Sequence, residues 1–208
     1  MKRVAVLDYG RGNLRSVQKA LERVGLSAQV TRIPQEILDA QALVLPGVGA
    51  FRDCMDSLER LGLLDPLLRS LEAGKPFLGI CLGLQILFDE SEEFGPSPGL
   101  GFFSGRVRRF SADAPAMKEL KIPHMGWNTV QCAPDSKLFR GIPPETYFYF
   151  VHSYYVEPED PQIVLGRTEY GVPFPSVVQK DHVVATQFHP EKSQRFGLKL
   201  LENFGAEI

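Results

Sequence analysis

The sequence contains few cysteines, and they are poorly spaced for a disulfide framework or a zinc cluster. Its three cysteines, Cys54, Cys81 and Cys132, are an odd number and include no C-x-x-C pair. Small disulfide-stabilised domains and structural zinc sites need paired or closely spaced cysteines. The pattern argues against both and favours a reducing compartment. The four histidines show no metal-ligand spacing either, so we expect no metal and no cofactor.

An excess of charge and a long hydrophobic run are also missing. The 23 Lys and Arg residues nearly balance the 25 Asp and Glu residues, so nothing favours a nucleic-acid backbone or an anionic membrane as partner. The N-terminal apolar run already meets an acid at Asp8, and no stretch of about 18 apolar residues occurs elsewhere. We therefore expect a cytoplasmic protein with no nucleic-acid or membrane partner.

The composition that remains suits one globular domain over residues 1–208, since 44% of the residues are hydrophobic and no boundary interrupts the chain. The apolar runs of the first half are typical of strands buried on both faces, and helical patterns separate them. These runs are "RVAVLD", "QALVLPG" and "KPFLGI". A stripe of leucines from Leu58 to Leu68 predicts helix, which we expect Pro66 to break into two. The first half therefore predicts a parallel α/β arrangement.

The second half is strand-rich, with little helical periodicity before its end. Its apolar runs between Gly, Pro and Asp predict antiparallel or mixed strands. They are "TYFYFVHSYYV", "QIVLGRTEY", "FPSVVQK" and "HVVATQFH". We expect "EEFGPSPGLGFF" to form a surface loop and Ser193 to cap a final amphipathic helix. The whole pattern predicts an α/β fold whose mostly parallel central sheet is extended by antiparallel strands.

Cys81 stands where an apolar run meets a helical pattern, in "PFLGICLGLQILF". Gly79 and Gly83 flank it at two residues on each side, the spacing of a nucleophile elbow. Backbone N–H groups at the start of a helix favour the thiolate anion. The alternative is a small buried apolar residue, which is the commoner fate of a free cysteine and the one we expect for Cys54 and Cys132. The flanking glycines, the strand and the helix together favour a nucleophile.

A thiol nucleophile needs a base, and the base needs an orienting group. His189 follows a predicted strand in "VVATQFHPEKS", and Glu191 stands two residues later, within reach of one imidazole nitrogen. Taken alone, this spacing fits an ordinary exposed loop equally well. Paired with an elbow cysteine, it favours a Cys/His/Glu triad. The other histidines lack an adjacent acid, so we expect them to have structural or interface roles.

These segments resemble a known family. "GICLGLQ" and "QFHPEKS" are similar to the class I, triad-type glutamine amidotransferases. "LDYGRGNLRSV", "LPGVGAF", "IPHMGWN" and "FVHSYY" narrow the resemblance to the glutaminase subunits of imidazole glycerol phosphate synthases. The guanylate, anthranilate and pyridoxal phosphate relatives share the triad but not "PGVGAF" and "PHMGWN". The similarity runs from residue 4 to about residue 204, and it implies a three-layer, flavodoxin-like α/β fold.

The resemblance also implies a reaction. Cys81 would attack the side-chain amide of L-glutamine, His189 would protonate the departing ammonia, and Glu191 would orient His189. A thioester would form on Cys81 and water would release glutamate. By similarity, backbone N–H donors for the oxyanion come from Leu82 and from "PGVG" around Val48 and Gly49. For "PGVG" the residues alone predict only a strand-ending turn.

Glutamine contacts are implied for Gly47, Gln85, Ser153 and Tyr154. Gln85 lies four residues after Cys81, so one helical turn places both on one face, which points the same way without the resemblance. For Ser153 and Tyr154, packing in a strand is the alternative.

The family's ammonia acceptor is a (β/α)8-barrel cyclase subunit, which implies a heterodimer. This chain has no P-loop and no G-x-G-x-x-G of its own, which agrees with a nucleotide substrate being bound by the partner. The segments "RGNLR" and "HMGWN" would face the partner and contribute Asn13, His124, Met125 and Trp127. Trp127 fits a protein core equally well.

Two other classes of function remain open. One is a cysteine hydrolase of the same fold that acts on a peptide or another amide, and it would cleave peptides and ignore glutamine. The other is a binding subunit with an inert site, which would form no thioester with a glutamine analogue even beside its partner. The intact triad argues against the second.

Overall fold

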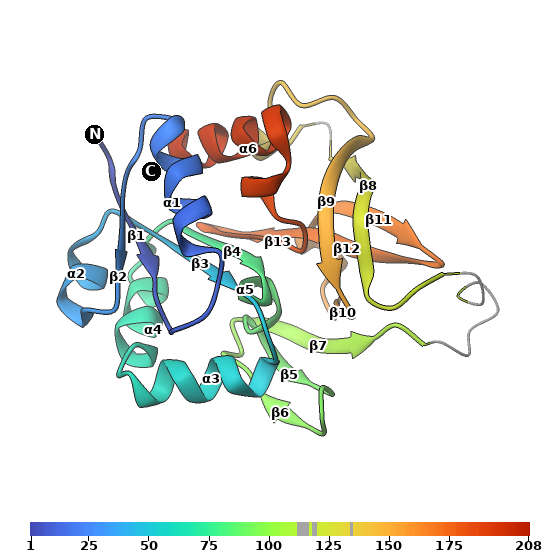
Figure 1. Ribbon diagram of the computed structural model, residues 1–208, viewed down its shortest axis with the longest axis horizontal. Helices are drawn as coiled ribbons and strands as arrows, with labels where there is room; N and C mark the ends of the chain where they lie inside the picture. The colour runs from blue at the N-terminus through green and yellow to red at the C-terminus, as the bar shows by residue number, and fades with distance from the viewer. Residues whose placement is uncertain (112–116, 118–119, 134) are drawn as a thin grey trace.

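The computed structural model describes residues 1–111, 117, 120–133 and 135–208 (Figure 1). Its centre is a nine-stranded sheet in which five neighbouring strands are parallel and the others are antiparallel. In spatial order the strands are β2 (Ser27–Thr31), β1 (Arg3–Leu7), β3 (Ala42–Gly47), β4 (Phe77–Cys81), β13 (Val183–Thr186), β12 (Val172–Lys180), β11 (Val164–Tyr170), β8 (His124–Cys132) and β9 (Thr146–His152). The predicted sheet, parallel at one side and extended by antiparallel strands, is confirmed.

Helices cover both faces of the parallel part, which gives three layers (Figure 1). On one face lie α1 (Leu14–Arg23) and α6 (Gln194–Ala206), and on the other lie α2 (Pro34–Asp39), α3 (Phe51–Arg60) and α4 (Leu64–Glu72). The parallel strands β1, β3, β4 and β13 each contribute side chains to both cores, because successive side chains point to opposite faces. In β1, Val4 and Val6 join the core of α1 and α6, whereas Ala5 and Leu7 join the core of the other three helices. The three-layer α/β class is thus confirmed.

A second, four-stranded sheet lies beside the first and was only partly predicted. Its order is β10 (Tyr154–Pro158), β7 (Phe103–Arg109), β5 (Phe88–Ser91) and β6 (Ser97–Pro98). The segment expected to be a plain loop therefore contains β6 and the start of β7. It is held by backbone pairing, since Ser91 faces Ser97 across a hairpin and both are buried. The expectation of a surface loop was wrong there.

Two helix expectations also need correction. The leucine stripe breaks at Gly62, whose φ of +67° a residue with a side chain rarely adopts, while Pro66 lies inside the first turn of α4, where its missing N–H costs nothing. The helix after Cys81, α5 (Leu82–Gln85), has a single turn. It ends early because Leu100 and Phe102 donate their N–H groups to the carbonyls of Ile86 and Leu87. None of the described helices is long and apolar enough to span a membrane.

Short 3-10 turns complete the described structure: η2 (Lys137–Phe139), η3 (Pro161–Ile163) and η4 (Pro190–Lys192). The parallel strands β3, β4 and β13 are neighbours, and Gly47 pairs with Cys81 at the carboxyl ends of the first two. In open α/β sheets, sites form at this end of the strands. The fold thus brings the ends of "LPG", "GIC" and "VVAT" together, with residues 187–191 following directly.

Candidate active site

Cys81 occupies a strained turn at the end of β4. Its φ of +57° and ψ of −106° are rare for a residue with a side chain, and the helix begins at the next residue. The neighbouring glycines allow this close approach: a Cβ on Gly83 would lie 2.0 Å from the Leu45 carbonyl oxygen, and one on Gly79 would lie 2.4 Å from the Gly83 oxygen. The backbone therefore has the sharp strand-to-helix geometry that the sequence predicts.

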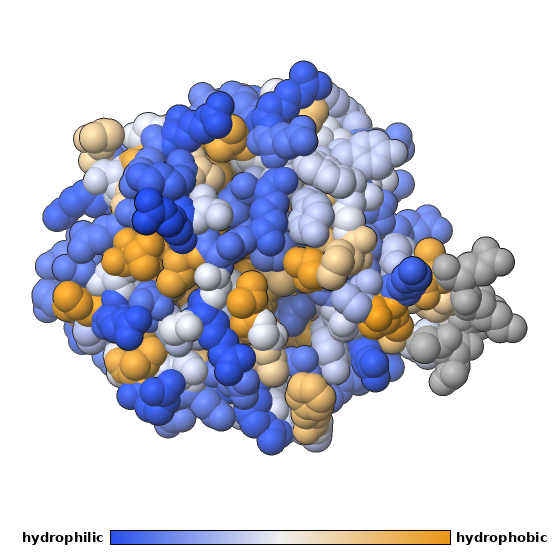
Figure 2. Space-filling view, in the orientation of Figure 1, coloured by the Kyte–Doolittle hydropathy of each residue, from blue (hydrophilic) through white to orange (hydrophobic). Residues whose placement is uncertain are grey.

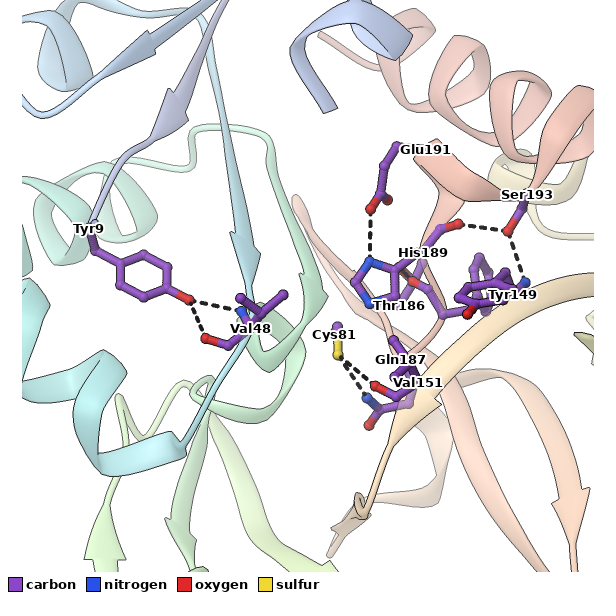
Figure 3. A network of polar contacts seen from close by, with 11 residues as sticks. Tyr9, Val48, Cys81, Tyr149, Val151, Thr186, Gln187, His189, Glu191 and Ser193 are labelled. Carbon is purple, nitrogen blue, oxygen red and sulfur yellow. Dashed lines mark hydrogen bonds and ion pairs between the residues drawn. The ribbon is translucent and has the colours of Figure 1, made fainter. Parts of the chain in front are cut away.

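His189 and Glu191 form a buried pair beside Cys81 (Figure 3). His189 Nδ1 lies 2.8 Å from Glu191 Oε1. A carboxylate accepts, so Nδ1 carries the proton and Nε2 is the nitrogen left for the sulfur. Nε2 has no hydrogen-bond partner among the described residues. This orientation leaves Nε2 free to exchange a proton with Cys81.

The chain around His189 is fixed by the residues of β9 and of the helix that follows. The His189 N–H donates to the Tyr149 carbonyl at 2.9 Å, and the Ser193 hydroxyl donates to the His189 carbonyl at 2.6 Å. Ser193 Oγ also accepts from the Tyr149 N–H at 3.0 Å. Ser193 precedes α6 as expected, but its side chain makes no cap hydrogen bond, because its oxygen is used to tie the histidine segment to β9.

The charge environment favours a protonated imidazole. Burial alone would lower the pKa of His189, but the Cys81 sulfur and the Glu191 carboxylate beside it outweigh burial and raise this pKa to about 10. Both neighbours therefore favour the imidazolium form of His189.

A cavity of about 300 Å³ opens over these groups. Of the residues predicted to act, its lining includes Cys81, His189, Val48, Gly49, Leu82, Gln85, Ser153 and Tyr154. Glu191 lies behind His189, and Gly47 does not line the cavity. A Cβ on Gly47 would lie 2.6 Å from Leu82 Cβ, so its glycine is explained by packing against the elbow.

Glu93 also lines the cavity, and sequence reasoning missed it. Its Oε2 accepts from the Phe51 N–H at 2.6 Å, at the start of α3. Nothing in the sequence distinguishes Glu93 from the other acids of "DESEE". Only the fold brings this carboxylate to the cavity.

The backbone N–H and carbonyl of Val48 are both bound by Tyr9, a second residue that sequence reasoning did not assign. The Val48 N–H donates to Tyr9 Oη at 3.0 Å, and the Tyr9 hydroxyl donates to the Val48 carbonyl at 3.2 Å. In Figure 3, Val48 is drawn between Tyr9 and Cys81. The N–H of Gly49 points opposite to the Val48 carbonyl, because the peptide between them is trans. The Val48 N–H is thus directed at Tyr9, whereas the Gly49 N–H points away from Tyr9.

The residues expected to face a partner are not all at the surface. Met125 and Trp127 are 62% and 46% exposed on β8, and Asn13 is partly exposed at the start of α1. His124 is buried, and its interface role is corrected here: its Nδ1 lies 2.9 Å from His152 Nε2, and its ring stacks on Tyr170. On the face drawn in Figure 2, hydrophobic side chains lie in a broken band across the middle, over the region where Figure 1 draws β3 and α5.

Burial sets the charge of the two histidines. It lowers the pKa of His124 to about 4 and that of His152 to about 3, so both are neutral near pH 7. Among the described residues, no group of three or more His, Cys, Asp or Glu side chains is arranged to hold a metal ion.

Comparison with known proteins places this geometry in a family. The sequence profile described as "Glutamine amidotransferase class-I" matches residues 5–208. "Imidazole glycerol phosphate synthase subunit HisH" of Syntrophotalea carbinolica is 55% identical over 203 residues, which cover 97% of this chain and 98% of that protein. The protein of the same name from Desulfitobacterium hafniense is 54% identical and is covered over 93% of its length. Among solved structures, a "Crystal structure of glutamine amidotransferase" superposes with a TM-score of 0.74 at 23% identity, covering 97% of this chain and 98% of that one.

Proposed function

The chain belongs to the class I glutamine amidotransferase family, and on this premise we propose that it is the glutaminase subunit of an imidazole glycerol phosphate synthase. It hydrolyses L-glutamine to glutamate and ammonia and passes the ammonia to a (β/α)8-barrel cyclase subunit, a step of histidine biosynthesis. The observation that carries the proposal is the meeting of the strained Cys81 elbow with the buried His189 and Glu191 pair at one cavity. An amide hydrolase needs this combination of nucleophile, base and orienting acid.

The proposed reaction starts with proton transfer from Cys81 Sγ to His189 Nε2. The thiolate attacks the side-chain amide carbon of glutamine, and the C–N bond breaks as Nε2 returns its proton to the departing nitrogen. Ammonia leaves and a thioester remains. His189 then takes a proton from water, which attacks the thioester and releases glutamate and the free thiol. Glu191 keeps the proton of Nδ1 in place throughout, so Nε2 always exchanges the proton.

The cavity offers groups for both ends of the amino acid. Glu93 places a carboxylate at its lining, which suits the α-ammonium group of glutamine, and Gln85 presents an amide from the elbow helix. A ligand that matches these polar groups gains specificity. We assign Glu93 and Gln85 to substrate binding, with Ser153 and Tyr154 at the same wall. The glutamine contact expected for Gly47 stays a prediction.

An oxyanion site needs backbone N–H donors that point into the cavity. Leu82 directly follows the nucleophile and lines the cavity, so its N–H is suited to be one donor. The second donor assigned from the resemblance comes from "PGVG" around Val48 and Gly49, and of these two the Val48 N–H is bound to Tyr9. We propose that the peptide before Val48 rotates when the partner and its substrate are bound. The lone chain would then be nearly silent, which prevents loss of ammonia to water.

The cyclase would contact Met125, Trp127 and Asn13. The two β8 side chains are large, apolar and exposed, which is typical of interface anchors. We place the complex in the cytoplasm, because the three cysteines are free and the proposed nucleophile acts only when reduced.

The test is to measure glutamate release under three conditions. These are the chain alone, the chain with a barrel cyclase from an organism whose own glutaminase chain is similar to this one, and the same complex with the cyclase substrate or a non-reactive mimic. We expect a rise of about a thousandfold in the last case, since a bias of about 4 kcal/mol in the donor peptide gives that factor. Three similar rates would contradict activation by the partner. Cleavage of peptides without any glutamine hydrolysis would contradict the function itself.

A further inference from the structure

Gln187 is a fully buried amide that contacts the nucleophile from behind the cavity. Its Nε2 lies 3.7 Å from Cys81 Sγ, and its side chain is not part of the cavity lining. It follows β13 and precedes His189 by two residues, so the segment that carries the base also carries this amide (Figure 3). The reaction described above gives Gln187 no role.

The orientation of this amide is determined by a chain of hydrogen bonds that starts at a backbone carbonyl. Gln85 Nε2 donates to the Tyr154 oxygen at 3.1 Å, and a carbonyl oxygen can only accept. The same Nε2 donates its second hydrogen to Gln187 Oε1 at 3.2 Å. Gln187 therefore turns its oxygen to Gln85 and its nitrogen, a donor, to Cys81.

The two contacts of the sulfur respond oppositely when the proton leaves. As a thiol, Cys81 Sγ donates to the Val151 carbonyl at 3.8 Å and accepts from Gln187. As a thiolate it can no longer donate, whereas the hydrogen bond from Gln187 becomes charge-assisted and stronger. The amide thus favours the ionised form of the nucleophile over the neutral form.

We propose that Gln187 is a catalytic residue that donates a hydrogen bond to the Cys81 thiolate and that Gln85 holds it in the donating orientation. The inference deepens the proposed glutaminase function and rests on it. During attack the negative charge moves from sulfur to the oxyanion, so the hydrogen bond from Gln187 is strongest on the thiolate before attack. Because Gln187 does not reach the cavity, its effect falls on turnover and not on glutamine binding.

The test uses Gln187→Met, which keeps an unbranched side chain but removes the donor. We measure alkylation of Cys81 by iodoacetamide in the full chain, followed by mass spectrometry of the peptide that carries Cys81. At about pH 7 the rate should fall about 10- to 100-fold, since hydrogen bonds to charged groups have that effect on an equilibrium. The gap should narrow in more alkaline buffer. The titratable groups facing the sulfur are His189, Tyr9, His152 and Glu93, and the substitution changes none of them.

Three comparisons make the test decisive. Gln179→Met removes a glutamine of β12 whose side chain donates to the Asp181 carbonyl, and it should alkylate at the wild-type rate. In the complex, Gln187→Met should lower kcat about 10- to 100-fold with KM nearly unchanged. Gln85→Met, which frees the Gln187 amide to turn over, should slow alkylation less than Gln187→Met.

A folded Gln187→Met chain with wild-type alkylation and kcat would overturn the proposal. If that variant does not fold, wild-type alkylation of Gln85→Met would overturn it instead. Alkylation needs neither glutamine nor the cyclase, so a slowed reaction in a chain that never hydrolyses glutamine would refute the proposed function and leave the role of Gln187 standing.

Discussion

Tyr9→Phe, which removes one hydroxyl group, should raise the low basal rate of glutamine hydrolysis that we expect for the lone chain. Tyr9 Oη accepts from the Val48 N–H at 3.0 Å and donates to the Val48 carbonyl at 3.2 Å, so it contacts the peptide before Val48 and the peptide after it. Such a bond has a net contribution of about 0.5 to 1.5 kcal/mol, and the bond from the Val48 N–H must break before this N–H can face the cavity. The free-energy cost of the active orientation should therefore fall by about 0.5 to 1.5 kcal/mol, which corresponds to a basal rate about 2- to 12-fold higher.

The assay is glutamate release by the full chain without a partner, with Tyr147→Phe as the matched control. Tyr147 is 60% exposed on β9, outside the site, and its substitution should leave the basal rate unchanged. With the cyclase and its substrate bound, Tyr9→Phe should differ little from wild type, because the peptide is then already rotated. An unchanged or lower basal rate in folded Tyr9→Phe would refute the reasoning that Tyr9 restrains a donor of the oxyanion site.

Other predictions follow from the triad, the elbow and the buried histidines. His189→Ala should lower turnover more than Glu191→Ala, because the base transfers protons while the acid orients it, and equal or reversed losses of kcat would show that the roles are wrong. Gly83→Ala should destabilise the fold by about 3 kcal/mol or more in urea unfolding, since its Cβ would lie 2.0 Å from a backbone oxygen, and a smaller loss would mean that the elbow relaxes easily. The pKa values of His124 and His152, lowered to about 4 and about 3, mean that the unfolded chain takes up protons first as the pH falls below 6.5. Their stabilisation is present above pH 6.5 and is lost toward about pH 4, so the free energy of unfolding should fall over this window, and a flat profile would contradict their burial in neutral form.

The sequence predicted those features that have a local signal. Apolar runs ending in Gly, Pro or Asp marked β1, β3 and β4, because strands buried on both faces need no alternation. The elbow was visible because Gly79 and Gly83 are needed where two backbone segments nearly touch. The pair of strands β5 and β6 was missed, since short strands with polar residues have no distinctive period.

The residues missed at the site share a different cause. Tyr9 meets Val48 across 39 positions of the chain, and Gln187 meets Cys81 across 106. Contacts of this kind depend on which strands become neighbours, and no spacing in the sequence records them. His124 was expected at the surface for the same reason, whereas its ring is enclosed by the aromatic side chains of β9, β11 and β12.

The variant Cys81→Ala, in complex with a barrel cyclase, tests whether Cys81 generates the ammonia that the partner uses. Synthesis of the imidazole product is measured once with glutamine and once with an ammonium salt as the nitrogen source. We expect the variant to lose synthesis from glutamine and to keep synthesis from ammonium at the wild-type rate, because only the thioester step needs the thiol. Glutamine-dependent synthesis at the wild-type rate, or loss of both activities in a folded and bound variant, would contradict the claim that Cys81 generates ammonia for the partner.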